Sequence, residues 1–137
     1  MREILLVGIG GFIGAILRYI LSSMIQNDGS SFPWGTLVVN FIGTLLLGIV
    51  VYSAELVEFI NQDIRVFLTI GVLGAFTTMS TFGLESFNMF ENGNYLMLGL
   101  YLAGTILLVF LGMFVARSTV DLVGNTLQVT SPLQPSP

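Results

Sequence analysis

The segment from residue 74 to residue 85 reads GAFTTMSTFGLE and places two glycines, four hydroxyls and one carboxylate between apolar stretches. Each of these polar groups costs free energy in hydrocarbon unless a partner satisfies it. Gly74 permits backbone conformations that other residues avoid, and hydroxyls such as that of Thr77 can bond to freed backbone groups. The composition predicts a broken helix, whose unpaired carbonyl oxygens could coordinate a cation. The alternative is a continuous helix in which the hydroxyls bond to the preceding turn.

An aromatic ring and a carboxylate follow these hydroxyls. Rings in membrane helices usually only pack, but the edge of a ring carries partial positive charge, so Phe82 could help an anion to shed its water. Glu85 comes about one helical turn later, where a carboxylate should be hydrogen-bonded or close to water. The segment therefore offers groups for a cation at the break and for an anion beyond it.

Two further polar side chains lie inside apolar stretches. Asn40 precedes Thr44 by four residues, so the two share one face of a helix. Asn40 could form a hydrogen bond between helices, or it could line an ion pathway as a donor. Arg18 could extend to the membrane surface along its aliphatic stem, or it could line a water-filled vestibule that attracts anions.

The composition excludes most other chemistry. The 137 residues are 54% hydrophobic and 9% charged, which is too little charge for a water-facing surface, so we expect an integral membrane protein. Without Cys, His or Lys the chain lacks thiolate metal sites, Schiff-base chemistry and the commonest general base, so we expect no enzyme. The net charge of −4 argues against nucleic-acid partners.

The elements that hold these residues are predicted to be four membrane-spanning helices. About 20 apolar residues in a helix cross a hydrocarbon core of ~30 Å. Four segments meet this length, at about residues 4–24, 34–54, 66–90 and 95–116, and together they form one domain, residues 1–117. Thr77 should lie near the centre of the bilayer, since it comes about 11 residues into the third span. Residues 118–137 form a polar tail, and its proline-rich end should be disordered.

The distribution of arginines predicts an orientation. Successive loops alternate sides, so both termini share one side with the connection between the second and third spans. That side carries Arg2, Arg65 and Arg117, whereas the other two connections contain no Arg or Lys. Positively charged loops stay in the cytoplasm, which places both termini there.

Four helices are too few to enclose a pathway alone, so we expect the chain to associate. Gly10 and Gly14 form a GxxxG pair, which marks either a closely packed pair of helices or the seam of a dimer.

Three motifs together point to a family. They are GGFIGAILRY at residues 10–19, GTLVVN at residues 35–40 and GAFTTMSTF at residues 74–82 with Glu85. Each is moderately specific, and all three in this order within a four-span chain are highly specific. Over about residues 4–116 the chain resembles the Fluc (CrcB-like) fluoride channels of bacteria. The resemblance implies a fluoride-selective channel that exports fluoride passively across the bacterial cytoplasmic membrane and gives resistance to fluoride.

The resemblance also implies an assembly and a set of site residues. The assembly is an antiparallel, dual-topology dimer with two fluoride pores and a structural sodium ion at its centre. Backbone carbonyl oxygens of Gly74 and Thr77 from both subunits would hold the sodium ion, and Arg18 would sit near a vestibule. The fluoride pathway would be lined by Asn40, Met79, Ser80, Thr81, Phe82, Glu85, Tyr101 and Thr105, the last two being candidates by their spacing.

Two features depart from the family's pattern. Relatives usually have Phe at both aromatic positions of TTFSTF, whereas this chain has Met79 at the first, and a thioether cannot present a positive ring edge. The pore fed by this position should be altered, slower or differently selective. The arginine bias favours a fixed orientation, whereas an antiparallel homodimer needs a chain that inserts both ways. Both features fit one half of a two-gene pair, so homodimer and paralogue heterodimer stay open.

A rival class of function is a small dual-topology multidrug or guanidinium exporter, which also has four spans. Such a transporter needs a carboxylate deep in its first helix to exchange substrate for protons. Here Glu3 lies at the start of that helix, and Arg18 is the only charge inside it. A non-transporting membrane scaffold is disfavoured by the polar cluster in the third span, because such groups usually mark function.

Overall fold

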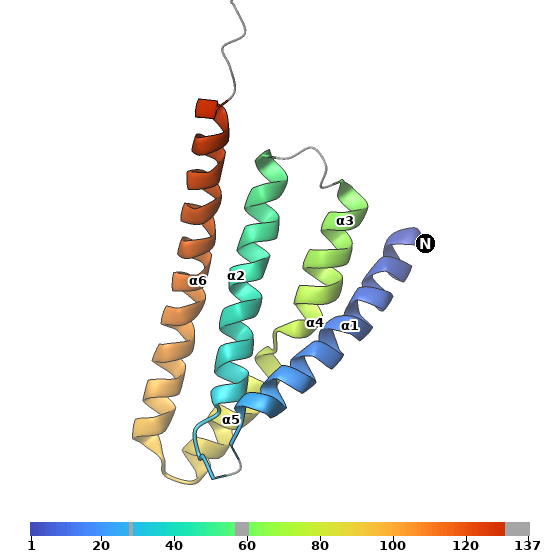
Figure 1. Cartoon of the computed structure of the whole chain (residues 1–137). Helices are drawn as coiled ribbons and strands as arrows, with labels where there is room; N and C mark the ends of the chain where they lie inside the picture. Colours follow the sequence, from blue (N-terminus) through green and yellow to red (C-terminus); the bar gives the residue numbers. More distant parts are fainter. Residues whose placement is uncertain (28, 57–60, 131–137) are drawn as a thin grey trace, which may run out of the picture.

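The computed structural model describes residues 1–27, 29–56 and 61–130, and this part of the chain is helical without strands (Figure 1). The elements are α1 (Arg2–Ile25), α2 (Trp34–Leu56), α3 (Gln62–Val66), the π-helix η1 (Phe67–Leu73), α4 (Gly74–Phe76), α5 (Met79–Glu91) and α6 (Tyr95–Thr130). Four segments are long and apolar enough to cross a membrane: Arg2–Ile25, Trp34–Ala54, Gln62–Glu91 and Tyr95–Thr126. The predicted all-α fold with four spans is confirmed for the described residues.

Polar side chains and one glycine set the ends of these helices. Gln26 leaves the helical conformation after α1, and its Oε1 accepts a hydrogen bond from the amide of Gly35 at 3.2 Å. Asn61 caps α3, because its Oδ1 accepts from the amide of Ile64 at 3.0 Å. Gly93 has a φ of 72°, a left-handed conformation that glycine adopts without strain, and it makes the turn between α5 and α6.

The third span is assembled from several short helices. α3 continues into η1 and then α4, after which Thr77 (φ −75°, ψ 157°) and Thr78 (φ −146°, ψ 117°) are extended. α5 begins at the next residue, Met79. Helical geometry is therefore interrupted within the segment for which the sequence allowed a broken or a continuous helix. Hydroxyl back-bonding also occurs, since Thr77 Oγ1 donates to the carbonyl of Leu73 at 3.1 Å.

α1 lies against η1 with almost no side chain between the two backbones. A Cβ atom on Gly10 would lie 2.8 Å from the carbonyl oxygen of Phe67 and 2.9 Å from Cα of Gly71. A Cβ atom on Gly14 would overlap the carbonyl oxygen of Val72. Both glycines are buried. Of the two roles open to the GxxxG pair, the structure therefore shows close packing between helices of the same chain.

α2 packs along α6, and α5 closes one end of the bundle. Gly48 permits the close approach of α2 to α6, because a Cβ atom there would lie 2.6 Å from Cβ of Ala116. A cluster of buried residues, Leu37, Phe82, Met89 and Tyr101, lies where α2, α5 and α6 meet.

The start of α1, the end of α2, the start of α3 and the end of α6 lie at the same end of the molecule, as the alternation of loops predicted (Figure 1). At this end Arg2 and Asp63 form an ion pair at 2.7 Å, which ties α1 to α3.

α6 extends beyond the predicted fourth membrane span. We expected the fourth membrane span to end near residue 116. The helix that contains it has 36 residues in all and ends at Thr130, so it is about 54 Å long at helical rise, well beyond a core of ~30 Å. Arg117 supports this continuation, because its Nε pairs with Asp121 one turn later at 3.0 Å and its guanidinium lies 4.8 Å from the ring centre of Tyr52. The expected disorder falls on residues 131–137, which lie outside the described residues.

Candidate functional site

The interruption of the third span is held by a side chain of α2. Nδ2 of Asn40 donates to the carbonyl oxygen of Thr78 at 3.1 Å, and Oδ1 of Asn40 accepts from the amide of Thr78 at 2.8 Å. Only this orientation of the side-chain amide is possible, because a backbone N–H can only donate and a carbonyl can only accept. The interhelical hydrogen bond that the sequence allowed is therefore present. Because Nδ2 carries two hydrogens, Asn40 can also donate to a second acceptor such as an ion.

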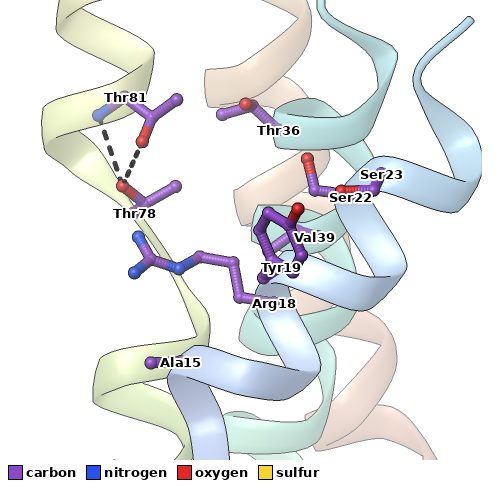
Figure 2. A pocket seen from close by; sticks show the side chains of 9 residues that line it. All are labelled: Ala15, Arg18, Tyr19, Ser22, Ser23, Thr36, Val39, Thr78 and Thr81. Atoms are coloured by element: carbon purple, nitrogen blue, oxygen red, sulfur yellow. Dashed lines mark hydrogen bonds between the residues drawn. The ribbon is translucent and has the colours of Figure 1, made fainter.

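Thr78 also caps α5. Its Oγ1 accepts from the amide of Thr81 at 3.3 Å and donates to Oγ1 of Thr81 at 2.9 Å, the two bonds that Figure 2 shows as dashed lines. Oγ of Ser80 lies 3.3 Å from the same hydroxyl. A threonine side chain that bonds the first free amides of a helix stabilises the helix start. Three of the segment's four hydroxyls, those of Thr78, Ser80 and Thr81, are therefore gathered at the start of α5.

These hydrogen bonds leave two backbone carbonyls without their usual donors. In a continuous α-helix the amide of Thr78 would bond to the carbonyl of Gly74, and the amide of Thr81 to that of Thr77. Here the first amide donates to Asn40 and the second to the Thr78 hydroxyl. The described residues contain no group of three or more His, Cys, Asp or Glu that could hold a metal. Backbone oxygens are thus the ligands that a hard cation would find at this point.

Arg18 reaches into a hollow beside the interruption (Figure 2). The hollow has a volume of about 290 Å³ and is lined from α1, α2 and the break by Ala15, Arg18, Tyr19, Ser22, Ser23, Thr36, Val39, Thr78 and Thr81. Several hydroxyls and one guanidinium face it, and none of these nine residues is acidic. A hollow of this kind attracts anions, because its only full charge is positive. Arg18 therefore lines this hollow, and the role of the hollow as an ion vestibule stays a prediction.

Two hydroxyls from other helices hold the carboxylate of Glu85. Oγ1 of Thr36 on α2 donates to Oε1 at 2.8 Å, and the hydroxyl of Tyr101 on α6 donates to Oε2 at 2.6 Å. Thr36 and Tyr101 are buried, and Glu85 is half-buried. The expectation that Glu85 is hydrogen-bonded is confirmed.

Phe82 packs inside this same cluster. The ring centre of Phe82 lies 5.0 Å from that of Tyr101. Phe32 also packs on Tyr101, in an edge-to-face arrangement with 5.6 Å between the ring centres. Phe82 is 8% exposed, so within one chain its ring is a core residue.

Thr105 lies one turn after Tyr101 on α6 and is 9% exposed. Its Oγ1 is buried and has no hydrogen-bond partner among the described residues. A buried hydroxyl without a partner costs free energy, so Thr105 Oγ1 is a candidate to donate to a group other than the described residues.

The predicted site residues therefore fall into groups. Asn40 and Thr81 both bond to Thr78. Glu85 bonds to Thr36 and Tyr101, and Phe82 packs on the ring of Tyr101. Gly74, Met79 and Ser80 lie on the exposed surface, with Met79 77% exposed.

Two central residues, Thr36 and Thr78, were absent from the predicted site. Thr36 precedes Asn40 by four residues, as Asn40 precedes Thr44, so a polar stripe at helical spacing was present in the sequence. Thr78 could not be separated from its neighbouring hydroxyls, because its importance lies in its backbone conformation.

Comparisons with known proteins agree on one family. The family described as "CrcB-like protein, Camphor Resistance (CrcB)" matches residues 5–117. The "Fluoride-specific ion channel FluC 1" of Methanosarcina acetivorans is 46% identical over 85% of this chain and 89% of its own length. The "Fluoride-specific ion channel FluC 3" of Methanosarcina barkeri is 44% identical over 86% and 89%. The "Fluoride-specific ion channel FluC" of Phocaeicola vulgatus is 43% identical over 82% and 93%.

Proposed function

The chain belongs to the CrcB-like family, and we propose that it is a fluoride-selective channel that exports fluoride passively and so protects the cell from fluoride. The observation that carries this proposal is the similarity to proteins named fluoride-specific ion channels, at 43–46% identity over at least 82% of this chain. Channels of this kind are not a class of enzyme. The membrane is the cytoplasmic membrane, which the chain crosses with its four apolar spans.

The chemistry of the site suits fluoride. Fluoride is small and strongly hydrated, so a pore must replace its water with several hydrogen-bond donors. Arg18 offers a charged donor in the vestibule, and the second hydrogen on Nδ2 of Asn40 offers a neutral one. The pathway continues through Met79, Ser80, Thr81, Phe82, Glu85, Tyr101 and Thr105. The unpartnered hydroxyl of Thr105 supports this route, because a passing anion would accept its hydrogen.

A structural sodium ion would fit the interruption, which we place near the middle of the bilayer. The carbonyl oxygens of Gly74 and Thr77, whose helical donors are diverted, are ligands of the type that Na⁺ takes. The ion would supply a positive charge that makes the centre of the protein less hostile to anions.

The assembly that we propose is an antiparallel dimer with two pores, formed with a second copy or with a paralogue. The exposure of Met79 and Gly74 supports a partner, because pathway and cation-site residues on a bare surface need a second subunit to enclose them. The arginine bias leaves both partners open.

The test of function is a liposome efflux assay with a fluoride electrode. Purified protein should release fluoride and hold back chloride. If it passes no fluoride, either alone or with a paralogue, the channel assignment is wrong. The rival exporter predicts proton-coupled uptake of guanidinium instead; it is disfavoured because Glu3 is exposed at the start of α1, far from the depth that coupling requires.

The test of assembly is the accessibility of the loops from each side of the membrane when the chain is expressed alone. Finding both orientations would contradict a fixed topology and favour the homodimer, whereas a single orientation would favour a paralogue as partner.

A further inference from the structure

A second hollow lies at the end of the molecule where α1 passes to α2 and α5 to α6. Its volume is about 380 Å³, and its wall includes Gln26, Ser31, Glu85, Asn88 and Asn94. Loop and helix-end residues form most of this wall, which places the hollow on the water side of the spans. Glu85 belongs both to this wall and to the cluster with Thr36 and Tyr101. The hollow therefore adjoins the proposed fluoride pathway.

The side chains that line this hollow differ in whether they are already hydrogen-bonded within the chain. Gln26 is used to shape the loop, since its Nε2 donates to the carbonyls of Ser30 and Phe32 at 3.4 and 3.3 Å. Asn88 and Asn94 are exposed, and their backbones bond within the turn between α5 and α6 while their side-chain amides remain accessible to solvent. These two side chains can therefore donate to a solute.

The described residues in the wall of the hollow carry one carboxylate and no positive charge. The residues that the structure places in its wall include no cation, and both oxygens of its one carboxylate, Glu85, already accept hydrogen bonds. An ion path needs sites that bind strongly enough for entry and weakly enough for exit. Neutral amides meet this condition, because they replace part of the water of an anion without binding it tightly.

We propose that this hollow is a mouth of the fluoride pathway, in which the side-chain amides of Asn88 and Asn94 exchange water for the ion beside Glu85. The inference rests on the proposed function and extends it to residues outside the three motifs. A mouth of this kind makes a specific electrostatic prediction. A positive charge placed in it concentrates fluoride and raises flux, and a negative charge lowers flux.

The chain contains no cysteine, so Asn88→Cys creates a unique thiol that can be modified in detergent before reconstitution. A methanethiosulfonate reagent carrying a trimethylammonium group adds a positive charge, and one carrying a sulfonate adds a negative charge. Each forms a mixed disulfide with the thiolate and releases a sulfinate. Asn27→Cys is the matched control, because Asn27 is an exposed asparagine at the same end but outside the wall of the hollow.

The readout is fluoride efflux from liposomes at low and high ionic strength, with complete labelling verified by mass. For Asn88→Cys we expect the cationic label to raise flux and the anionic label to lower it, each by about two-fold, with both effects shrinking in salt. Neither label should matter on Asn27→Cys. If flux at low ionic strength is equal after the two labels, the proposal that this hollow is a mouth of the fluoride pathway is wrong. Failure of the unmodified chain to carry fluoride would instead overturn the proposed function, and this inference with it.

Discussion

Asn40 on α2 and Thr78 in the interruption of the third span pair through both polar atoms of the asparagine side chain, at 3.1 and 2.8 Å. Thr78 is extended, so its amide has no acceptor in the preceding helical turn, and Asn40 supplies one. The asparagine amide supplies one donor and one acceptor and thereby takes the place of a neighbouring backbone. A single side chain of one span thus stabilises the break in another.

Asn40→Asp should lower both fluoride flux and stability. A carboxylate can accept from the amide of Thr78 but cannot donate to its carbonyl, and it places negative charge on the pathway. We expect the loss of the hydrogen bond to the Thr78 carbonyl to cost about 0.5–1.5 kcal/mol. Efflux from liposomes and thermal unfolding in detergent measure the two effects. Asn27→Asp makes the same change on the exposed surface and should alter neither; unchanged flux in Asn40→Asp would remove Asn40 from the pathway.

Thr105→Val should separate function from stability. Valine has nearly the shape of threonine, and the Thr105 hydroxyl has no partner to lose among the described residues. Stability should therefore stay constant or rise by up to about 1 kcal/mol, whereas fluoride flux should fall.

The control for this variant is Thr119→Val, which removes an exposed hydroxyl that donates to the carbonyl of Val115 at 2.8 Å, outside the proposed pathway. It should leave flux unchanged. A Thr105→Val protein that conducts normally would show that the buried hydroxyl does not serve the ion.

Tyr101→Phe should destabilise the cluster around Glu85. The variant keeps the ring but removes the 2.6 Å hydrogen bond to the carboxylate, and bonds to charged groups contribute about 1.5–3 kcal/mol. The unfolding temperature in detergent should fall, and fluoride flux should fall with it. Tyr95→Phe removes an exposed hydroxyl from the same helix and serves as the control. Equal behaviour of the two variants would mean that the Tyr101 hydroxyl is dispensable.

Gly14→Ala should separate α1 from η1. The added methyl group would overlap the carbonyl oxygen of Val72, which belongs to backbone and cannot rotate away. Overpacking of this kind costs about 1–3 kcal/mol. Gly8→Ala is the matched control on the same helix, because nothing lies within 4 Å of a Cβ atom there. Its stability should stay equal or improve, since alanine favours helix over glycine by up to ~1 kcal/mol. If both variants unfold alike, the contact between the two backbones is not tight.

Met79→Phe should preserve or raise fluoride flux. Met79 is 77% exposed at the first turn of α5, so a larger ring meets no obstacle within the chain and would offer an edge to the ion in the assembly. Leu84→Phe, at a position 62% exposed on the same helix, controls for the added ring and should leave flux unchanged. A loss of flux in Met79→Phe alone would show that the partner surface is shaped for methionine.

The sequence by itself determined the class of protein, its four spans and the positions at which polar groups interrupt them. These are local properties, because the cost of a hydroxyl, an amide or a carboxylate in hydrocarbon depends on the residue and its immediate neighbours. For the same reason the sequence predicted that Glu85 is hydrogen-bonded or close to water, and that Gly10 and Gly14 mark either close packing or a dimer seam, although it could not name the partners. The continuation of α6 beyond its predicted span was not read from the sequence, because helix stability outside the membrane depends on pairs such as Arg117 with Asp121 rather than on hydropathy.

Only the tertiary structure decided which groups meet. The partner of Asn40 lies 38 residues away and the partners of Glu85 lie 49 and 16 residues away, on other helices. The π-helical turn η1 and the extended conformation of Thr78 likewise follow from contacts with α1 and α2. The free-energy cost of burying a polar group can be read from one segment of the sequence. The hydrogen bond that offsets this cost needs a partner on a second segment at a suitable distance and angle, and only the packing of the whole chain sets that geometry.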